Sequence, residues 1–267
     1  QSVYKKAGEV GRFDLILIDE AHLIPPSGEG MYRTFIEEMK VLNPNVRIVG
    51  LTATPYRLKA GTICSDENIL NHICYQIGVK DLIDDGYLSP LISKSSRDSV
   101  NTDDLHIRGG EFIPAEVAAL VDDDSVVIKA CHDLIQRTQD RNSVLIFAAS
   151  VEHAYHVQKT LSNMGQVVEV VTGETLDLQR ESFIEQFKDK QLKYLVNVNV
   201  LTTGFDAPNV DCVVLLRPTM SAGLYYQMVG RGFRICEGKE NCLVLDYAEN
   251  ILRHGPIDQV KINEPKK

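Results

Sequence analysis

The sequence predicts an α/β fold with parallel sheets, divided into two domains. Short apolar runs alternate with segments of helical periodicity along most of the 267 residues. Strands that are buried on both faces form such runs, and their alternation with helices implies a parallel sheet. Polar and glycine-containing sequences follow several of these runs. Open α/β sheets bind ligands at this place, the carboxyl ends of their strands. A chain of 267 residues is also long enough for about two domains.

The first domain is expected over residues 1–91. The apolar run at 13–18 predicts a buried parallel strand, and the run at 46–51 predicts another short strand. Between them, residues 29–42 predict an amphipathic helix, because apolar side chains recur at helical spacing. The apolar face of this helix consists of Tyr32, Phe35, Ile36 and Met39.

A linker is expected at residues 92–124, before a second domain at 125–250 and a tail at 251–267. The linker is poor in apolar periodicity and contains the pair Gly109-Gly110. From residue 125 onwards helices and strands alternate regularly. Helices are expected at 125–139, 152–163, 176–188 and 223–233, and strands at 143–149, 166–172, 194–200, 211–216 and 242–247.

Composition narrows the class of protein. Hydrophobic residues make up 44% of the chain and charged residues 24%, which is typical of folded domains. No apolar run approaches the roughly 20 residues that span a bilayer, and no signal peptide is visible. The six cysteines lack paired spacing, which indicates reduced thiols and an intracellular, cytoplasmic protein. The net charge of −9 argues against a broad basic patch but does not exclude a narrow nucleic-acid channel.

Two short motifs carry the chemistry. Asp19-Glu20-Ala21-His22 follows the first predicted strand, and its carboxylates could bind Mg²⁺ and orient an attacking water. In the second motif, residues 227–234, Arg231 and Arg234 are three positions apart, so that on a helix they would share one face. Arginine there can neutralise charge on a transferring phosphate. The two motifs are therefore complementary halves of a nucleotide-hydrolysis site.

With three further segments, these motifs resemble the ordered motifs of superfamily 2 helicases and translocases of the DEAH type. The further segments are Leu51-Thr52-Ala53-Thr54-Pro55, residues 144–150 and residues 198–208. The sequences of residues 202–206 and 229–234 are most similar to those of the RadD-type repair helicases. Restriction-enzyme motor subunits are close relatives of that group. The resemblance runs from Gln1 to about Tyr247. It implies a partial first RecA-like domain and a complete second one.

The resemblance also implies a role for each motif residue, with ATP and Mg²⁺ as cofactors. Asp19 would bind Mg²⁺ and Glu20 would position the attacking water. Residues that would couple the nucleotide site to nucleic acid, or contact it, are His22, Thr52, Thr54, Thr202 and Thr203. Residues that would face the nucleotide in the second domain are Gly204, Asp206, Gln227, Arg231 and Arg234. For Gly204 a plain turn glycine remains the alternative, and Asp206 would contact the ribose or cap its turn.

One family element is missing from the sequence. The phosphate loop, Gly-x-x-x-x-Gly-Lys-Ser/Thr, should precede Asp19 and is absent. We therefore expect the chain to be part of a longer protein and to be inactive alone. The expected function is ATP-driven unwinding of nucleic acid or movement along it, with DNA favoured over RNA and repair proteins as partners. The alternatives are a restriction-type motor that translocates duplex DNA without unwinding it, and a binding module that does not hydrolyse ATP.

Overall fold

The structure, a computed structural model, describes residues 3–25, 28, 30–53, 56–57, 61–95, 99–200 and 206–257. The described residues up to Gln76 form one compact unit and those from Ile77 onwards form a larger one. This division lies before the boundary expected at residue 91. The reason is that strand β5 (Leu91–Ser95) pairs with the sheet of the larger unit. No described helix is long and apolar enough to cross a membrane.

The smaller unit contains a pair of parallel strands and a covering helix. Strand β1 (Leu15–Ile18) pairs in parallel with β2 (Arg47–Gly50), and α2 (Met31–Leu42) buries Ile36 against Ile18. The expectation that β1 is fully buried is wrong, because Leu15 and Leu17 are 50% and 63% exposed. Ile16 and Ile18 point to the face that packs against α2, whereas Leu15 and Leu17 point to the opposite face and are exposed. The remaining elements are α1 (Ala7–Val10), a 3₁₀ turn (Ala21–Leu23), β3 (Tyr56–Arg57) and β4 (Gly61–Thr62).

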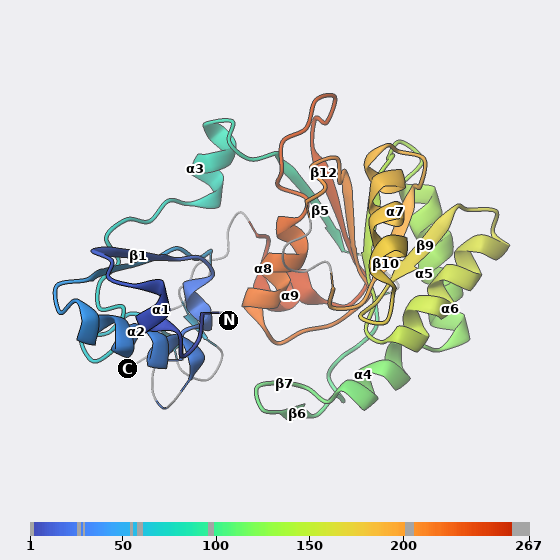
Figure 1. Ribbon diagram of the computed structural model, residues 1–267. Coiled ribbons are helices and arrows are strands. Elements are labelled where there is room, and N and C mark those ends of the chain that lie inside the picture. Colours follow the sequence, from blue (N-terminus) through green and yellow to red (C-terminus); the bar gives the residue numbers. More distant parts are fainter. Residues whose placement is uncertain are drawn as a thin grey trace. The chain divides into compact units, whose positions relative to one another are not determined.

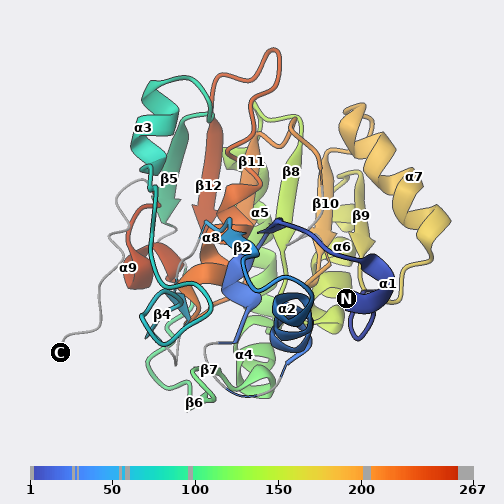
Figure 2. The ribbon, with the colours of Figure 1, turned by 60° about the vertical axis from the view of Figure 1, so that its left-hand side comes forward.

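The larger unit is built on a six-stranded parallel sheet. The strand order is β5-β12-β11-β8-β10-β9, and every pairing is parallel (Figure 2). The other strands are β8 (Val144–Phe147), β9 (Val168–Val171), β10 (Tyr194–Asn197), β11 (Cys212–Leu215) and β12 (Cys242–Asp246). This mixed α/β architecture with a parallel sheet confirms the predicted fold class.

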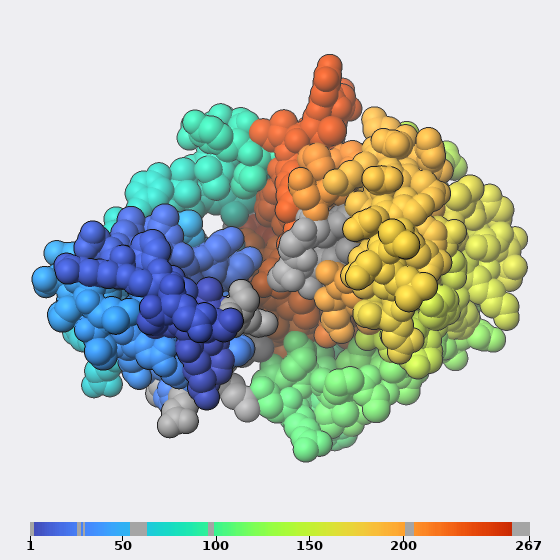
Figure 3. Space-filling model, in the orientation of Figure 1, coloured from blue at the N-terminus to red at the C-terminus, as the bar shows by residue number. Residues whose placement is uncertain are grey.

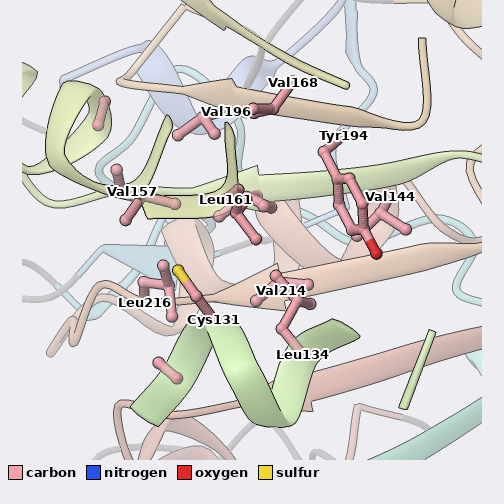
Figure 4. Packing of buried hydrophobic residues seen from close by; sticks show 14 of the residues in the cluster. Cys131, Leu134, Val144, Val157, Leu161, Val168, Tyr194, Val196, Val214 and Leu216 are labelled. Carbon is pink, nitrogen blue, oxygen red and sulfur yellow. The ribbon is translucent and has the colours of Figure 1, made fainter. Parts of the chain in front are cut away.

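Helices cover both faces of this sheet. Helices α5 (Asp124–Arg137) and α6 (Val151–Asn163) lie on one face, and α7 (Asp177–Lys188) and α8 (Ala222–Gly230) on the other (Figure 1). Alternate strand residues supply the two cores, since successive side chains of a strand point to opposite faces. The core under α5 and α6 includes Val144, Val157 and Tyr194 (Figure 4). The core under α7 and α8 includes Leu145, Phe187 and Tyr225.

The segment expected to be a linker is largely folded onto the larger unit. It contains β6 (Ile107–Arg108), β7 (Glu111–Phe112) and α4 (Pro114–Val121). Gly109 and Gly110 have φ values of 73° and 89°, so this glycine pair forms the tight turn of a hairpin. Phe112 and Val117 are buried in a small core of their own, packed against Ala149 and Met220. Two further short helices complete this unit, α3 (Val79–Asp84) and, inside the expected tail region, α9 (Asn250–His254).

Candidate nucleotide-hydrolysis site

The acidic motif follows directly after β1. Asp19 is exposed and Glu20 half-buried, and the Glu20 amide donates a hydrogen bond of 2.9 Å to Asp19 Oδ1. Glu20 has φ = 50°, in the left-handed region that residues other than glycine rarely adopt. Such conformations are often found at functional sites, where the surrounding structure holds them in place. The turn therefore holds both carboxylates at the carboxyl end of a parallel strand, as predicted.

His22 connects this motif to the end of β2. Its Nδ1 lies 2.9 Å from Thr52 Oγ1 and 3.2 Å from Glu20 Oε2. The backbone supports the contact, because the Ala21 amide donates to the Leu51 carbonyl over 2.9 Å. The 3₁₀ turn and the end of β2 also approach closely: a Cβ atom on Gly50 would lie 2.6 Å from Ala21 Cβ. The structure thus brings three of the predicted residues of the smaller unit together with Asp19.

The site could hold Mg²⁺ through Asp19. Magnesium in nucleotide sites is bound by one or two carboxylates together with waters and phosphate oxygens, so an exposed carboxylate fits this role. The described residues contain no cluster of three or more His, Cys, Asp or Glu side chains that could hold a metal alone. A cavity of about 290 Å³ adjoins Asp19. It is lined mainly by apolar side chains from β1 and α2, including Leu17 and Phe35, which offer little to phosphate groups.

The arginine motif of the larger unit lies at the end of α8. Ser221 caps the start of this helix by accepting a hydrogen bond from the Leu224 amide, and half-buried Gln227 lies within the helix. The helix ends at Gly230, with Arg231 as its C-cap, and Arg234 lies beyond it. The expectation that both arginines share one helix face is therefore wrong. The cause is a turn at 230–233, in which the Phe233 amide donates to the Gly230 carbonyl.

Arg234 forms an ion pair with Asp206. The Nη1–Oδ1 distance is 3.0 Å, and the side chains are 35% and 76% exposed. This pairing differs from both roles expected for Asp206, since the carboxylate contacts a catalytic candidate of the second motif. The two residues come from loops that are far apart in the sequence, and sequence spacing gave no signal for the pair. It joins the segment after β10 to the segment after α8.

A second contact between two loops, which the sequence does not predict, is a hydrogen bond between Arg217 and Asn199. The Arg217 guanidinium, after β11, donates a hydrogen bond to Asn199 Oδ1, after β10. Asn199 has φ = 58°, and burial lowers the pKa of Arg217. Both residues follow parallel neighbours of β8 at the carboxyl edge of the sheet. The contact therefore joins the residues that follow β10 and β11.

Some predicted residues lie outside the described part of the chain. These are Thr54, Thr202, Thr203 and Gly204. The predicted residues that are described fall into two groups, one in each compact unit. Asp19, Glu20, His22 and Thr52 belong to the smaller unit, and Asp206, Gln227, Arg231 and Arg234 belong to the larger one.

Comparisons with known proteins show similarity to helicases. Residues 126–236 match the family model of the helicase conserved C-terminal domain. The chain is 33% identical over 246 residues to the Schizosaccharomyces pombe protein "Putative mitochondrial ATP-dependent helicase irc3", covering 90% of this chain and 39% of the relative. It is 28% identical over 238 residues to "Putative ATP-dependent helicase IRC3" of Saccharomyces cerevisiae, covering 88% of this chain and 34% of the relative. The chain thus spans well under half the length of these two relatives.

A solved structure extends the similarity to nearly the whole chain. It is a fragment of an HsdR subunit of a type I restriction enzyme from Vibrio vulnificus. The sequences are 25% identical, the TM-score is 0.72, and the match covers 99% of this chain and 49% of that one. Both compact units therefore have counterparts in that fold.

Proposed function

We propose that this chain, which belongs to the superfamily 2 helicases and translocases, is part of an enzyme that couples ATP hydrolysis to movement along nucleic acid or its unwinding. DNA is favoured over RNA as the substrate, with a role in DNA repair and repair proteins as partners. We also propose an intracellular, cytoplasmic site of action, because the six cysteines lack the paired spacing of a disulfide framework. The S. pombe relative is described as a mitochondrial helicase.

One observation carries this proposal: His22 bonds Thr52 and also approaches the Glu20 carboxylate. The residue that would orient the attacking water is thereby connected to a neighbouring strand end. Strand ends of open α/β sheets are where ligands bind, so an altered position of Glu20 could be transmitted to a second ligand site. A module that only binds nucleic acid has no use for this connection.

The roles of the residues follow from their chemistry. Asp19 would hold the Mg²⁺ of the Mg–ATP complex, which neutralises negative charge on the phosphates. Glu20 would accept a hydrogen bond from the attacking water, in the orientation that its left-handed backbone imposes. Arg231 and Arg234 would stabilise the charge that develops on the transferred phosphoryl group, and Gln227 would contribute from α8.

The decisive experiment measures ATP turnover by the full-length gene product with and without single-stranded DNA. We expect DNA-stimulated turnover that Glu20→Gln abolishes, since the amide cannot act as the carboxylate does toward water. Glu9→Gln is the matched control, because Glu9 is an exposed glutamate in α1 of the same unit. The 267-residue chain alone should be inactive, because it lacks a phosphate loop. Absence of turnover in the full-length product would favour the binding module.

A second candidate function is translocation along duplex DNA without strand separation. The similarity to the restriction-enzyme subunit favours it. The two activities differ in product: a helicase releases a labelled strand from a duplex, whereas a pure translocase displaces a bound third strand and leaves the duplex intact. Measuring both with the full-length product separates them.

A further inference from the structure

The Lys239 ammonium lies among three backbone carbonyl groups. Its Nζ is 2.8 Å from the Gly232 oxygen, 2.7 Å from the Arg234 oxygen and 3.4 Å from the Pro208 oxygen. Lys239 belongs to the orange-red loop between α8 and β12, which stands out from the surface of the larger unit (Figure 3). Its side chain is nevertheless half-buried and turned back towards the arginine motif.

The carbonyl between the two held by Lys239 has a donor of its own. The Ser89 amide donates to the Phe233 oxygen over 2.7 Å. Three consecutive carbonyls, those of Gly232, Phe233 and Arg234, are therefore each bound from outside the segment. Gly232 is also pressed against β12, since a Cβ atom there would lie 2.5 Å from Cys242 Sγ. The backbone that leads into Arg234 is thus fixed on several sides.

Holding this ammonium in place costs free energy. Burial lowers the pKa of Lys239. Of the charged groups near it, the Asp211 carboxylate acts in the opposite direction and the Arg234 guanidinium adds to the lowering. An ammonium has three donors and no acceptor, and its contacts with three carbonyl oxygens match that number. Desolvating a charge is tolerated only where such hydrogen bonds compensate.

We propose that Lys239 is a positioning residue for Arg234. Its ammonium fixes the peptide groups that carry the Gly232 and Arg234 carbonyls, before Phe233 and after Arg234, and ties them to the Pro208 carbonyl, close in sequence to Asp206. In this arrangement only the side chain of Arg234 needs to move for the guanidinium to reach the phosphoryl group. Its guanidinium exchanges the Asp206 carboxylate for the phosphoryl group, while its backbone stays in place. This inference rests on the proposed function, because it assigns Arg234 to ATP hydrolysis.

The test uses Lys239→Met, which keeps most of the aliphatic stem and removes all three donors. In the full-length product we expect DNA-stimulated kcat to fall roughly a hundredfold, as for a small misplacement of a catalytic group. KM for ATP should change little, because Arg234 acts on charge that develops in the transition state. The matched control is Lys193→Met: Lys193 is also partly buried and bonds the Thr138 carbonyl at 2.7 Å, away from the arginine motif. This control should lower stability without lowering kcat.

A double variant separates positioning from a general structural role. If Lys239 acts through Arg234, adding Lys239→Met to Arg234→Ala should lower kcat no further. Additive losses would overturn the proposal, as would a normal kcat for Lys239→Met in a protein in which Arg234→Ala is strongly impaired. If thermal melting shows that Lys239→Met does not fold, Lys239→Gln takes its place with the same outcomes. Failure of the proposed function itself would be evident separately, as absence of turnover in the unmutated protein.

Discussion

His22 Nδ1 lies 2.9 Å from Thr52 Oγ1, and the same nitrogen lies 3.2 Å from Glu20 Oε2. With the imidazole proton on Nδ1, this nitrogen can donate to either oxygen, since an ionised carboxylate can only accept hydrogen bonds. That proton can be donated to one of the two oxygens at a time. A nucleotide that draws Glu20 towards an attacking water would therefore strengthen the contact with Thr52. The imidazole then acts as a connection between the ends of two parallel strands.

Thr52→Val should uncouple ATP turnover from nucleic acid. Valine matches threonine in shape but lacks the hydroxyl, so the connection to His22 is lost while packing is kept. In the full-length protein, stimulation of turnover by single-stranded DNA should fall roughly tenfold, within the usual range of coupling between sites. Basal turnover should stay near the unmutated value. Thr52→Ser, which retains the hydroxyl, should preserve stimulation; full stimulation of Thr52→Val would contradict this role.

Glu111 anchors the β6–β7 hairpin to the sheet, and its loss should loosen the hairpin. One carboxylate oxygen accepts from Thr219 Oγ1 at 2.5 Å and the other from the Met220 amide at 2.7 Å. Glu111→Ala should lower the free energy of unfolding by about 1–3 kcal/mol, as expected for buried groups that lose partners. Glu111→Gln keeps one acceptor and should lose less. Hydrogen exchange should accelerate at 106–112 in Glu111→Ala; unchanged exchange there would show that the anchor is unimportant.

These contacts mark the limit of what the sequence could predict. Local patterns sufficed for the helices of the larger unit, because apolar spacing and caps such as Asp123 and Ser150 act over a few residues. The apolar run of β1 predicted a strand but not which face is covered, since that depends on its neighbours. The pair Gly109-Gly110 was interpreted as linker, although the same dipeptide forms hairpin turns.

The candidate site was also predictable only where it depends on residues that are close together in the sequence. Asp19, Glu20 and His22 are adjacent in sequence, and their position after a strand fixed their place in the sheet. The partner of Arg234 and the carbonyls bound by Lys239 depend on how separate loops fold back. Arg231 and Arg234 were expected to share one face of a helix, but the helix ends at Gly230, before both residues.

His153 should make the larger unit sensitive to acid. This histidine is 2% exposed, and burial lowers its pKa from 6.5 to about 4. The unfolded chain takes up a proton near pH 6.5 whereas the folded chain does not, so stability is full above that pH. As the pH falls from about 6.5 towards about 4, on the order of 3 kcal/mol should be lost.

The measurement for His153 compares the unfolding free energies of the unmutated chain and His153→Asn between about pH 7.5 and about pH 4.5. This window covers most of the range between the unfolded pKa of 6.5 and the folded pKa of about 4. Asparagine can still accept the hydrogen bond that the Ala149 amide donates to His153 Nδ1 at 3.3 Å. Other groups, such as Asp246, whose pKa burial raises, titrate alike in both proteins and cancel in the difference. A difference that does not change with pH would show that His153 is not the cause.

Arg234→Ala provides the sharpest test of the arginine motif. In the full-length protein we expect DNA-stimulated kcat to fall by roughly a thousandfold, in the range for arginine fingers. Affinity for ATP should fall far less, because the guanidinium is paired with Asp206 until charge develops on the phosphate. The melting temperature should hardly change, since an ion pair this exposed contributes little stability.

Arg234→Lys should not restore turnover, because a point charge does not reproduce the planar fork of guanidinium donors. Arg137→Ala, which removes another partly exposed arginine paired with an aspartate, is the control and should keep normal kcat. Near-normal kcat for Arg234→Ala, with an unchanged melt, would remove Arg234 from the chemistry and leave its pairing with Asp206 as a structural contact.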